Sequence, residues 1–249
     1  MTNRYSGLKL GVVTPMAKEK DTVEKFVQEV LAVCRLFSFK TIRFYVVLDH
    51  ASTDGTLDVL KNMGEHIQEL KVIFAPDNKN VVDAYKRGYR EAITEGVDWI
   101  LEMDGGFSHK PEDIPKFFET MMKGGYDCVF GSRFCPKGKI ENGSVKRTLV
   151  SWGGTWAANI LLGTKLWDMT SGFELFTRRA LSWVLEKGIV SEGPFFQTEI
   201  RTFAHKFKIT EVPITYDAAT QQIHRKSLSD ALRNLKRLCF MRLRGQLYT

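Results

Sequence analysis

Short apolar runs alternate along the first half of the chain with segments that repeat apolar residues every three or four positions. The runs at residues 8–13, 44–48, 72–75 and 99–103 predict four strands. The segments between them predict helices, the first with Asp21 as its N-cap and Glu24 three residues on, and the third over residues 82–94. This order predicts an α/β fold with a doubly wound, mostly parallel sheet.

Polar residues follow the predicted strands. Pro15, Asp49, Asp77 and Asp104 each come within two residues of the end of one of the four apolar runs. In a doubly wound sheet, ligands bind in the crevice at the carboxyl ends of the strands. We therefore expect these four residues to line one crevice of a nucleotide-binding layout.

The second half of the chain is less regular. A fifth strand is expected at residues 128–132, and the Gly- and Lys-rich residues 135–144 indicate a mobile loop. Helix-like and strand-like segments then alternate as far as Tyr216.

The last segment has the pattern of a basic amphipathic helix, with Ser227 and Asp230 spaced as a capping box. The apolar face is formed by Leu228, Ala231, Leu232, Leu235, Leu238, Cys239 and Leu243. The opposite, basic face is formed by Arg233, Lys236, Arg237, Arg242 and Arg244. We predict an α/β domain over residues 1–226 and a helical arm over residues 227–249. The arm would pack on the core or rest on an anionic membrane surface.

Composition narrows the classes of function only a little. The 249 residues carry a net charge of +7, which favours anionic partners such as nucleic acid, phospholipid or nucleotides. The basic residues lack the interleaved aromatic residues of a nucleic-acid surface, so we expect no nucleic-acid partner. The four cysteines are scattered, which indicates neither a zinc site nor a disulfide framework.

The chain has no uninterrupted apolar run of about 20 residues, the length needed to cross a bilayer. Its start, MTNRYSGLKLGVV, lacks the basic region, apolar run and cleavage site of a signal peptide. We expect a cytoplasmic protein that binds peripherally to the cytoplasmic face of the membrane.

Several segments, in order, resemble family-2 glycosyltransferases, and especially the dolichyl- and polyprenyl-phosphate mannose synthases. Residues 15–19, PMAKE, stand where that family has PTYNE, and residues 49–56, DHASTDGT, where it has DDGSPDGT. The resemblance implies a GT-A fold and a nucleotide-sugar donor contacted by Pro15, Glu19 and Asp49, to which the crevice adds Asp77.

Residues 103–111, MDGGFSHKP, resemble the family's metal motif, MDADLSHDP. The resemblance implies that Asp104 binds Mg²⁺ or Mn²⁺ together with the donor diphosphate. Gly106 replaces the second carboxylate of the motif, which removes one negative charge and one oxygen ligand for a hard cation. Ser108 or His109 could assist Asp104.

An acceptor phosphate site is implied by residues 131–134, GSRF, which resemble the family's GSRY. Arg147 and Ser151 fall at the spacing of further acceptor contacts, and Arg225 in the run RKS stands for a later basic motif. Arginine suits this task because its guanidinium group makes paired, charge-assisted hydrogen bonds to phosphate.

Three later segments complete the resemblance: WDMTSGF at residues 167–173, FFQTE at residues 195–199 and EVPI at residues 211–214. Within the second, Gln197 and Glu199 are implied to line the donor sugar site.

Together these motifs imply an inverting glycosyltransferase that moves a sugar from a GDP- or UDP-linked donor to a polyprenyl phosphate, with Asp104, Arg133 and Arg147 as its catalytic residues. An acceptor phosphate is already an oxyanion and needs orientation rather than a strong base. Two alternatives remain open. One is a sugar-hydroxyl acceptor, with Glu199 or Asp168 as the base, and the other is a nucleotide-sugar-binding protein without turnover.

Overall fold

The structure, a computed structural model, describes residues 4–218 and 225–248. Within these ranges, seven strands form one mixed sheet in the order β3-β2-β1-β4-β7-β5-β8, and two short strands, β6 and β9, form a parallel pair. The strands are β1 (Lys9–Met16), β2 (Thr41–Leu48), β3 (Leu70–Phe74), β4 (Trp99–Glu102), β5 (Cys128–Ser132), β6 (Lys139–Glu141), β7 (Glu174–Thr177), β8 (Ile209–Pro213) and β9 (Thr215–Asp217).

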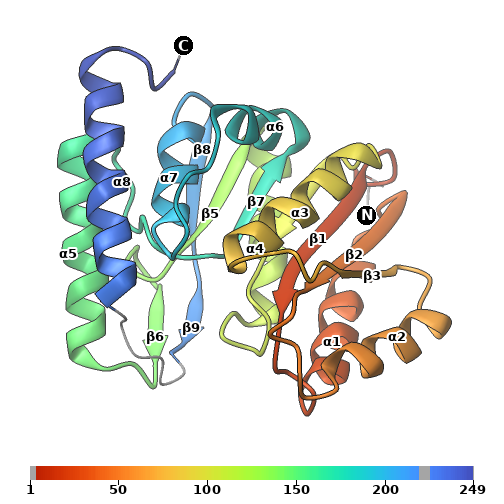
Figure 1. Cartoon of the computed structure of the whole chain (residues 1–249). Coiled ribbons are helices and arrows are strands. Elements are labelled where there is room, and N and C mark those ends of the chain that lie inside the picture. The colour runs from red at the N-terminus through yellow and green to blue at the C-terminus, as the bar shows by residue number, and fades with distance from the viewer. Residues whose placement is uncertain (1–3, 219–224, 249) are drawn as a thin grey trace.

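Helices cover both faces of the sheet (Figure 1). They are α1 (Val23–Arg35), α2 (Thr56–His66), α3 (Val81–Thr94), α4 (Ile114–Gly124), α5 (Val145–Leu162), α6 (Arg178–Lys187), α7 (Phe196–Ala204) and α8 (Arg225–Leu243), with a short 3-10 turn at Pro111–Asp113. Strands β1 to β4 run parallel to one another, β5 and β8 pair in parallel, and β7 between β4 and β5 is antiparallel to both. The predicted doubly wound, mostly parallel α/β fold is therefore confirmed.

Alternation along the strands produces two cores, one on each face of the sheet. In β2, Phe44, Val46 and Leu48 pack with α1, α2 and α4 on one face. Tyr45, between them in sequence, packs with α3 on the other, where α6 and α7 complete the core. Successive strand residues point to opposite faces, so a strand with helices on both sides is apolar throughout.

The first helix shows how the local pattern translates into packing. The apolar positions predicted to share a face in α1 are all buried, from Val23 to Cys34. Burying each large apolar side chain of this kind contributes about 1.5–3 kcal/mol. Its N-cap is Thr22 rather than Asp21, and no side chain caps the helix. Glu19 instead supplies the carbonyl oxygen that accepts from the backbone N–H groups of Thr22 and Val23.

Two further local predictions are corrected. Residues 135–144 were expected to form a loop, but they contain β6, which pairs with β9 because the chain returns there after β8. Helix α8 begins at Arg225, so Ser227 lies inside the helix and does not cap it.

Helix α8 lies beside α5 at the edge of the molecule next to β8 and α7 (Figure 1). The guanidinium group of Arg242 donates to the carbonyl oxygens of Ile160 and Leu161 at 3.0 and 2.9 Å. The expected single apolar face of α8 is only partly correct. Leu238 is buried in the core, whereas Leu228, Leu232 and Leu243 are exposed, because the buried face also carries Asp230 and Asn234. The boundary at residue 227 stays a prediction.

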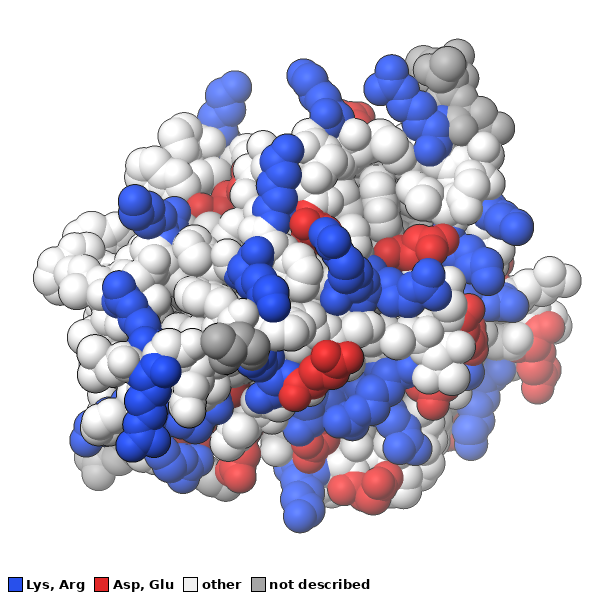
Figure 2. Space-filling view, turned by 90° about the horizontal axis from the view of Figure 1, so that it is seen from above, with Lys and Arg blue, Asp and Glu red and all other residues white. Residues whose placement is uncertain are grey.

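Lys and Arg side chains project from much of the face shown in Figure 2, with Asp and Glu between them. Among the described helices, none combines the length and the apolar character that crossing a bilayer requires.

Candidate active site

The parallel register of β1 to β4 brings the predicted crevice residues to one edge of the sheet. Pro15 is the penultimate residue of β1, and Asp49, Asp77 and Asp104 come shortly after β2, β3 and β4. Asp49 Oδ1 accepts from the backbone N–H of Ala51 at 2.8 Å, which fixes the turn after β2. Asp77 is exposed. The structure therefore gathers these residues at the edge where ligands of such sheets bind.

The Asp104 carboxylate accepts a hydrogen bond on one side and is exposed to solvent on the other. The hydroxyl group of Tyr85, on α3, donates to Asp104 Oδ1 at 2.5 Å. The Asp104 side chain keeps 43% of its surface exposed. Burial, followed by the nearby Asp104 and Glu102 carboxylates, raises the pKa of Tyr85 well above its ordinary value, so this hydroxyl group remains a donor. One carboxylate oxygen is thus fixed while the group as a whole faces the crevice.

His109 anchors the turn that follows Asp104. Its Nδ1 accepts from the backbone N–H of Asp104 at 3.3 Å, and its ring stacks on Phe173 with centroids 5.0 Å apart. The side chain is fully buried, which lowers its pKa to about 4 and keeps it neutral. His109 therefore shapes the turn around Gly106, and Nδ1 is already engaged.

Gln197 and Gly172 meet beside Asp104. The Gln197 side-chain amide, on α7, donates to the buried Glu102 carboxylate at the end of β4. A Cβ atom on Gly172 would lie 2.9 Å from Gln197 Nε2 and 3.5 Å from Asp104 Oδ1. A side chain at position 172 would therefore push the Gln197 amide away from its place beside Asp104. The TSGF and FFQTE segments therefore reach the crevice together.

Glu199 has a different environment from the one predicted. It is fully buried, and its oxygens accept from the backbone N–H groups of Val190 and Ser191, at 3.0–3.2 Å, and from the Ser191 hydroxyl. It also forms an ion pair with Arg237 of α8. Since these partners occupy both carboxylate oxygens, we leave Glu199 out of the donor site proposed below.

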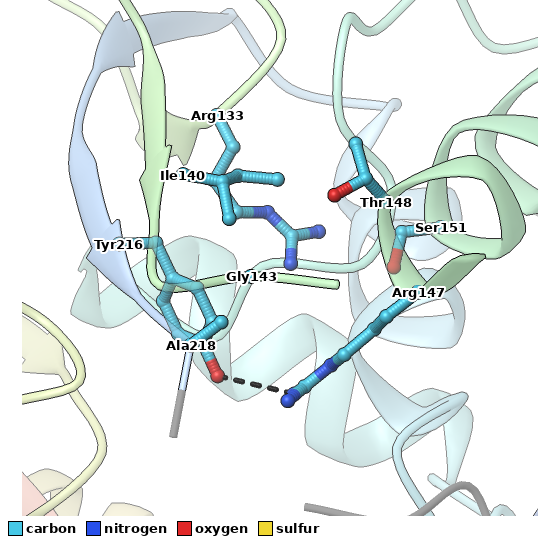
Figure 3. Close-up of a pocket in the computed structure, with 8 residues that line it drawn as sticks. All are labelled: Arg133, Ile140, Gly143, Arg147, Thr148, Ser151, Tyr216 and Ala218. Atoms are coloured by element: carbon cyan, nitrogen blue, oxygen red, sulfur yellow. Dashed lines mark hydrogen bonds between the residues drawn. The ribbon is translucent and has the colours of Figure 1, made fainter. Parts of the chain in front are cut away.

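A second site lies between the end of β5, the β6–β9 pair and the first turns of α5 (Figure 3). Eight residues line this pocket: Arg133, Ile140, Gly143, Arg147, Thr148, Ser151, Tyr216 and Ala218. Arg147 Nη2 donates to the Tyr216 hydroxyl at 3.3 Å, as the dashed line in Figure 3 shows. Arg133, Arg147 and Ser151, predicted from separate segments, are thereby brought into one pocket.

Arg133 lines the pocket from its buried side. Its Nε and Nη2 donate to the two carboxylate oxygens of Asp168 at 2.7 and 2.9 Å, and its guanidinium group lies 5.4 Å from the centre of the Tyr216 ring. The neighbouring Arg133 charge and its hydrogen bonds outweigh the effect of burial and hold the pKa of Asp168 well below its usual range. Asp168 therefore stays ionised and paired.

The pocket and the crevice are neighbours. The rings of His109 and Tyr216 lie 5.3 Å apart, so a short chain of contacts leads from Asp104 through His109 and Tyr216 to Arg147. The Arg225 side chain, also predicted to bind the acceptor, lies outside the described residues.

Three residues with roles at these sites were not predicted from the sequence. Tyr85 sits at a core position of α3, Tyr216 is a strand aromatic, and Arg201 is one of many basic residues. Arg201 is fully buried and donates to the carbonyl oxygens of Gly131 and Ser171 at 3.2 and 2.9 Å, which ties β5 to the TSGF segment. Only its place beside apolar residues of a helix hinted at burial.

Few protein groups are available to bind a metal ion. Among residues 4–218 and 225–248, no cluster of three or more His, Cys, Asp and Glu side chains could hold one. Asp104 remains suitable, because its carboxylate is half exposed and Mg²⁺ is commonly bound by one or two carboxylates plus substrate phosphates and water.

Comparison with known proteins decides the family. Residues 11–184 match the sequence profile described as glycosyl transferase family 2. The chain belongs to this family. The transferase is 34% identical to an undecaprenyl-phosphate mannosyltransferase of Micrococcus luteus over 173 residues, which cover 69% of this chain and 70% of the relative. It is 26% identical to a polyprenol monophosphomannose synthase of Mycolicibacterium smegmatis over 247 residues, covering 95% and 88%.

Solved structures confirm the fold of the transferase as GT-A. The glucosyl-3-phosphoglycerate synthase of Mycobacterium tuberculosis in complex with UDP superposes with a TM-score of 0.68 at 16% identity, covering 95% of this chain and 82% of that one. The same enzyme with Mn²⁺, UDP-glucose and phosphoglyceric acid gives a TM-score of 0.67 at 16% identity, covering 95% and 81%.

Proposed function

We propose that this glycosyltransferase moves mannose from a nucleoside diphosphate donor to a polyprenyl phosphate. The observation that carries the proposal is the pocket lined by Arg133, Arg147 and Ser151 beside the Asp104 crevice. Two guanidinium groups and a hydroxyl group suit a phosphate monoester. The names of the two relatives, a mannosyltransferase and a mannose synthase that act with polyprenyl-type phosphates, support this choice of sugar and acceptor.

The donor would bind along the carboxyl ends of β1 to β4. Pro15, Glu19, Asp49 and Asp77 would contact the nucleoside diphosphate, and Gln197 would face the sugar beside Asp104. Asp104 would hold a divalent ion, Mg²⁺ or Mn²⁺, which when bound stabilises the negative charge of the leaving diphosphate. The glucosyl-3-phosphoglycerate synthase complex that contains Mn²⁺ is consistent with such an ion in this fold.

The transfer itself would need little proton chemistry. A phosphate oxygen of the acceptor attacks the anomeric carbon as the bond to the diphosphate breaks, which inverts that carbon and releases the nucleoside diphosphate. Arg147 would orient the acceptor phosphate, and Arg133 would form the charged wall behind it.

A sugar-hydroxyl acceptor is less well supported, because the two candidate bases are already engaged. Asp168 is paired with Arg133 and has a pKa well below its usual range, and Glu199 is buried against Arg237 and backbone N–H groups. A general base works best with a pKa near the working pH and with room to reach the hydroxyl group.

We also propose that the outer face of α5 and α8 rests on the membrane that holds the acceptor. We call this surface the α5–α8 face. Its exposed apolar residues are Val145, Leu149, Trp152, Trp156 and Ile160 of α5, with Leu228, Leu232 and Leu243 of α8. The α5 residues recur every three or four positions, so they form one stripe on the helix that also contributes Arg147 and Ser151 to the pocket. Exposed apolar patches with tryptophan favour the membrane interface.

A donor panel tests the proposed reaction. GDP- and UDP-linked mannose and glucose would be incubated with Mg²⁺ or Mn²⁺, with and without a polyprenyl phosphate, and transfer of labelled sugar to lipid would be measured. We expect mannosyl transfer that needs the lipid and is abolished by a chelator. Nucleotide binding without transfer to any acceptor would instead favour a binding protein.

A further inference from the structure

Gly106 lies against a carboxylate from another loop. The φ angles of Gly106 and Phe107 are +75° and +65°, so the turn after β4 passes twice through the left-handed region. A Cβ atom added to Gly106 would lie 2.8 Å from Glu19 Oε2 and 3.1 Å from Oε1. At such a distance something must shift, so an aspartate here would displace the Glu19 carboxylate and would also adopt a strained positive φ. The Glu19 carboxylate fills the space beside Gly106 that a carboxylate at position 106 would need.

Glu19 is positioned by several hydrogen bonds. Its backbone N–H donates to Thr56 Oγ1 at 2.9 Å, and the Thr22 hydroxyl donates to Oε2 at 3.1 Å. Thr56 is itself held by Asp54, to which its hydroxyl donates at 2.6 Å. The loop between β1 and α1 is thereby fixed against the start of α2, and the Glu19 side chain is directed toward the turn after β4.

The charge of Glu19 is not neutralised by a neighbouring base. No Lys, Arg or His among the described residues forms an ion pair with it. Glu19 is only partly buried, so it can reach a ligand in the crevice. A partly desolvated carboxylate beside the donor site, with Asp104 two residues from Gly106, attracts a cation.

We propose that Glu19 supplies the second carboxylate of the divalent-metal site and replaces, from the β1–α1 loop, the acidic residue absent at position 106. Asp104 and Glu19 would hold the ion from the loops that follow β4 and β1, together with donor phosphate oxygens and water. This proposal rests on the proposed function, because the ion is the one that accompanies the donor diphosphate. It also explains why glycine stands at position 106, since Glu19 already occupies the neighbouring space.

Mn²⁺ binding provides the test, without acceptor and without turnover. Free Mn²⁺ would be measured by electron paramagnetic resonance in titrations with GDP and, separately, UDP. Glu19→Gln preserves shape and removes the charge, and we expect it to weaken Mn²⁺-nucleotide binding by about tenfold or more. Glu24→Gln, on the exposed first turn of α1, is the matched control and should bind like the wild type.

Moving the carboxylate back to the β4 turn gives the sharper test. Gly106→Asp alone should not improve Mn²⁺ binding, because the new side chain meets Glu19. Combining Glu19→Ala with Gly106→Asp clears that space, and aspartate tolerates a positive φ better than most residues. We expect the double variant to bind Mn²⁺ more tightly than Glu19→Gln, with a Kd within about threefold of the wild-type value.

The outcomes separate the two proposals. Equal Mn²⁺ binding by Glu19→Gln and the wild type, in protein that still binds the nucleotide, would overturn the role of Glu19 and leave the proposed function standing. A wild-type protein that binds neither nucleotide, with or without Mn²⁺, would overturn the proposed function itself and the metal site with it.

Discussion

Arg133 and Asp168 form a two-point ion pair in the interior of the protein, with Nε 2.7 Å from Oδ2 and Nη2 2.9 Å from Oδ1. Both side chains are at least nine-tenths buried. The pair fixes the end of β5 to the start of the TSGF segment, so Arg133 has a structural task besides its place in the pocket.

Replacing Arg133 should therefore lower the stability of the folded protein. Arg133→Ala leaves the Asp168 carboxylate buried without its partner, which should lower the free energy of unfolding by about 3–5 kcal/mol. Urea denaturation measures the change. Adding Asp168→Asn should recover part of it, because the second substitution removes the unpaired charge. A loss below about 1 kcal/mol in Arg133→Ala would show that the pair contributes little.

Arg147 offers the cleaner test of acceptor binding. It is only half buried, so Arg147→Ala should keep the stability of the wild type. Losing a charge-assisted hydrogen bond to phosphate should raise the KM for polyprenyl phosphate by about tenfold or more. The Kd for the nucleotide, measured by calorimetry, should stay within about twofold. Lys146→Ala, the exposed neighbour, is the control. Equal weakening of nucleotide and acceptor binding would contradict the assignment.

The α5–α8 face should control binding to lipid. Trp152 and Trp156 are 56% and 62% exposed, so replacing both by serine should leave stability unchanged. Because each tryptophan would bury a large apolar surface in the interface, we expect the double variant to bind anionic vesicles at least about tenfold more weakly in sedimentation. Leu36→Ser, an exposed apolar residue just past the end of α1, is the control and should bind vesicles normally. Unchanged vesicle binding of the tryptophan variant would rule out this face.

Glu174 should give the stability a characteristic pH dependence. It faces Glu102 across β7 and β4, and burial raises the pKa of Glu174 to about 7 from an ordinary 4.5, despite the opposing effect of Arg201. Between these values the folded protein retains a proton that the unfolded chain releases. This contribution to stability is therefore complete below about pH 4.5 and is lost as the pH rises through about 7.

The size of that effect is roughly 3 kcal/mol at most. Glu174→Gln should be less stable throughout, because Arg201 loses its partner, but its stability should decline less between pH 4.5 and 7 than that of the wild type. Denaturation at several pH values measures both slopes, with Glu119→Gln on the exposed face of α4 as control. Identical slopes for wild type and Glu174→Gln would mean that Glu174 is ionised in the folded protein.

The sequence by itself determined the elements and the edge at which chemistry gathers. The strands at residues 44–48 and 128–132 and the buried face of α1 follow from apolar spacing within one element, and local spacing is read directly from neighbouring residues. The position of Asp104 followed as well, because parallel strands place their carboxyl ends together.

The tertiary structure alone decided which charges meet. Arg133 and Asp168 are 35 residues apart in sequence, and Arg237 and Glu199 are 38 apart. No local pattern distinguishes an arginine that will bind phosphate from one that will pair with a buried carboxylate. The approach of Glu19 to Gly106 likewise depends on the order β2-β1-β4, which brings the ends of β1 and β4 side by side although three helices and three strands separate the two residues in sequence. Packing of distant segments fixes these partners, because each buried charge needs a counter-charge that only the folded chain brings within reach.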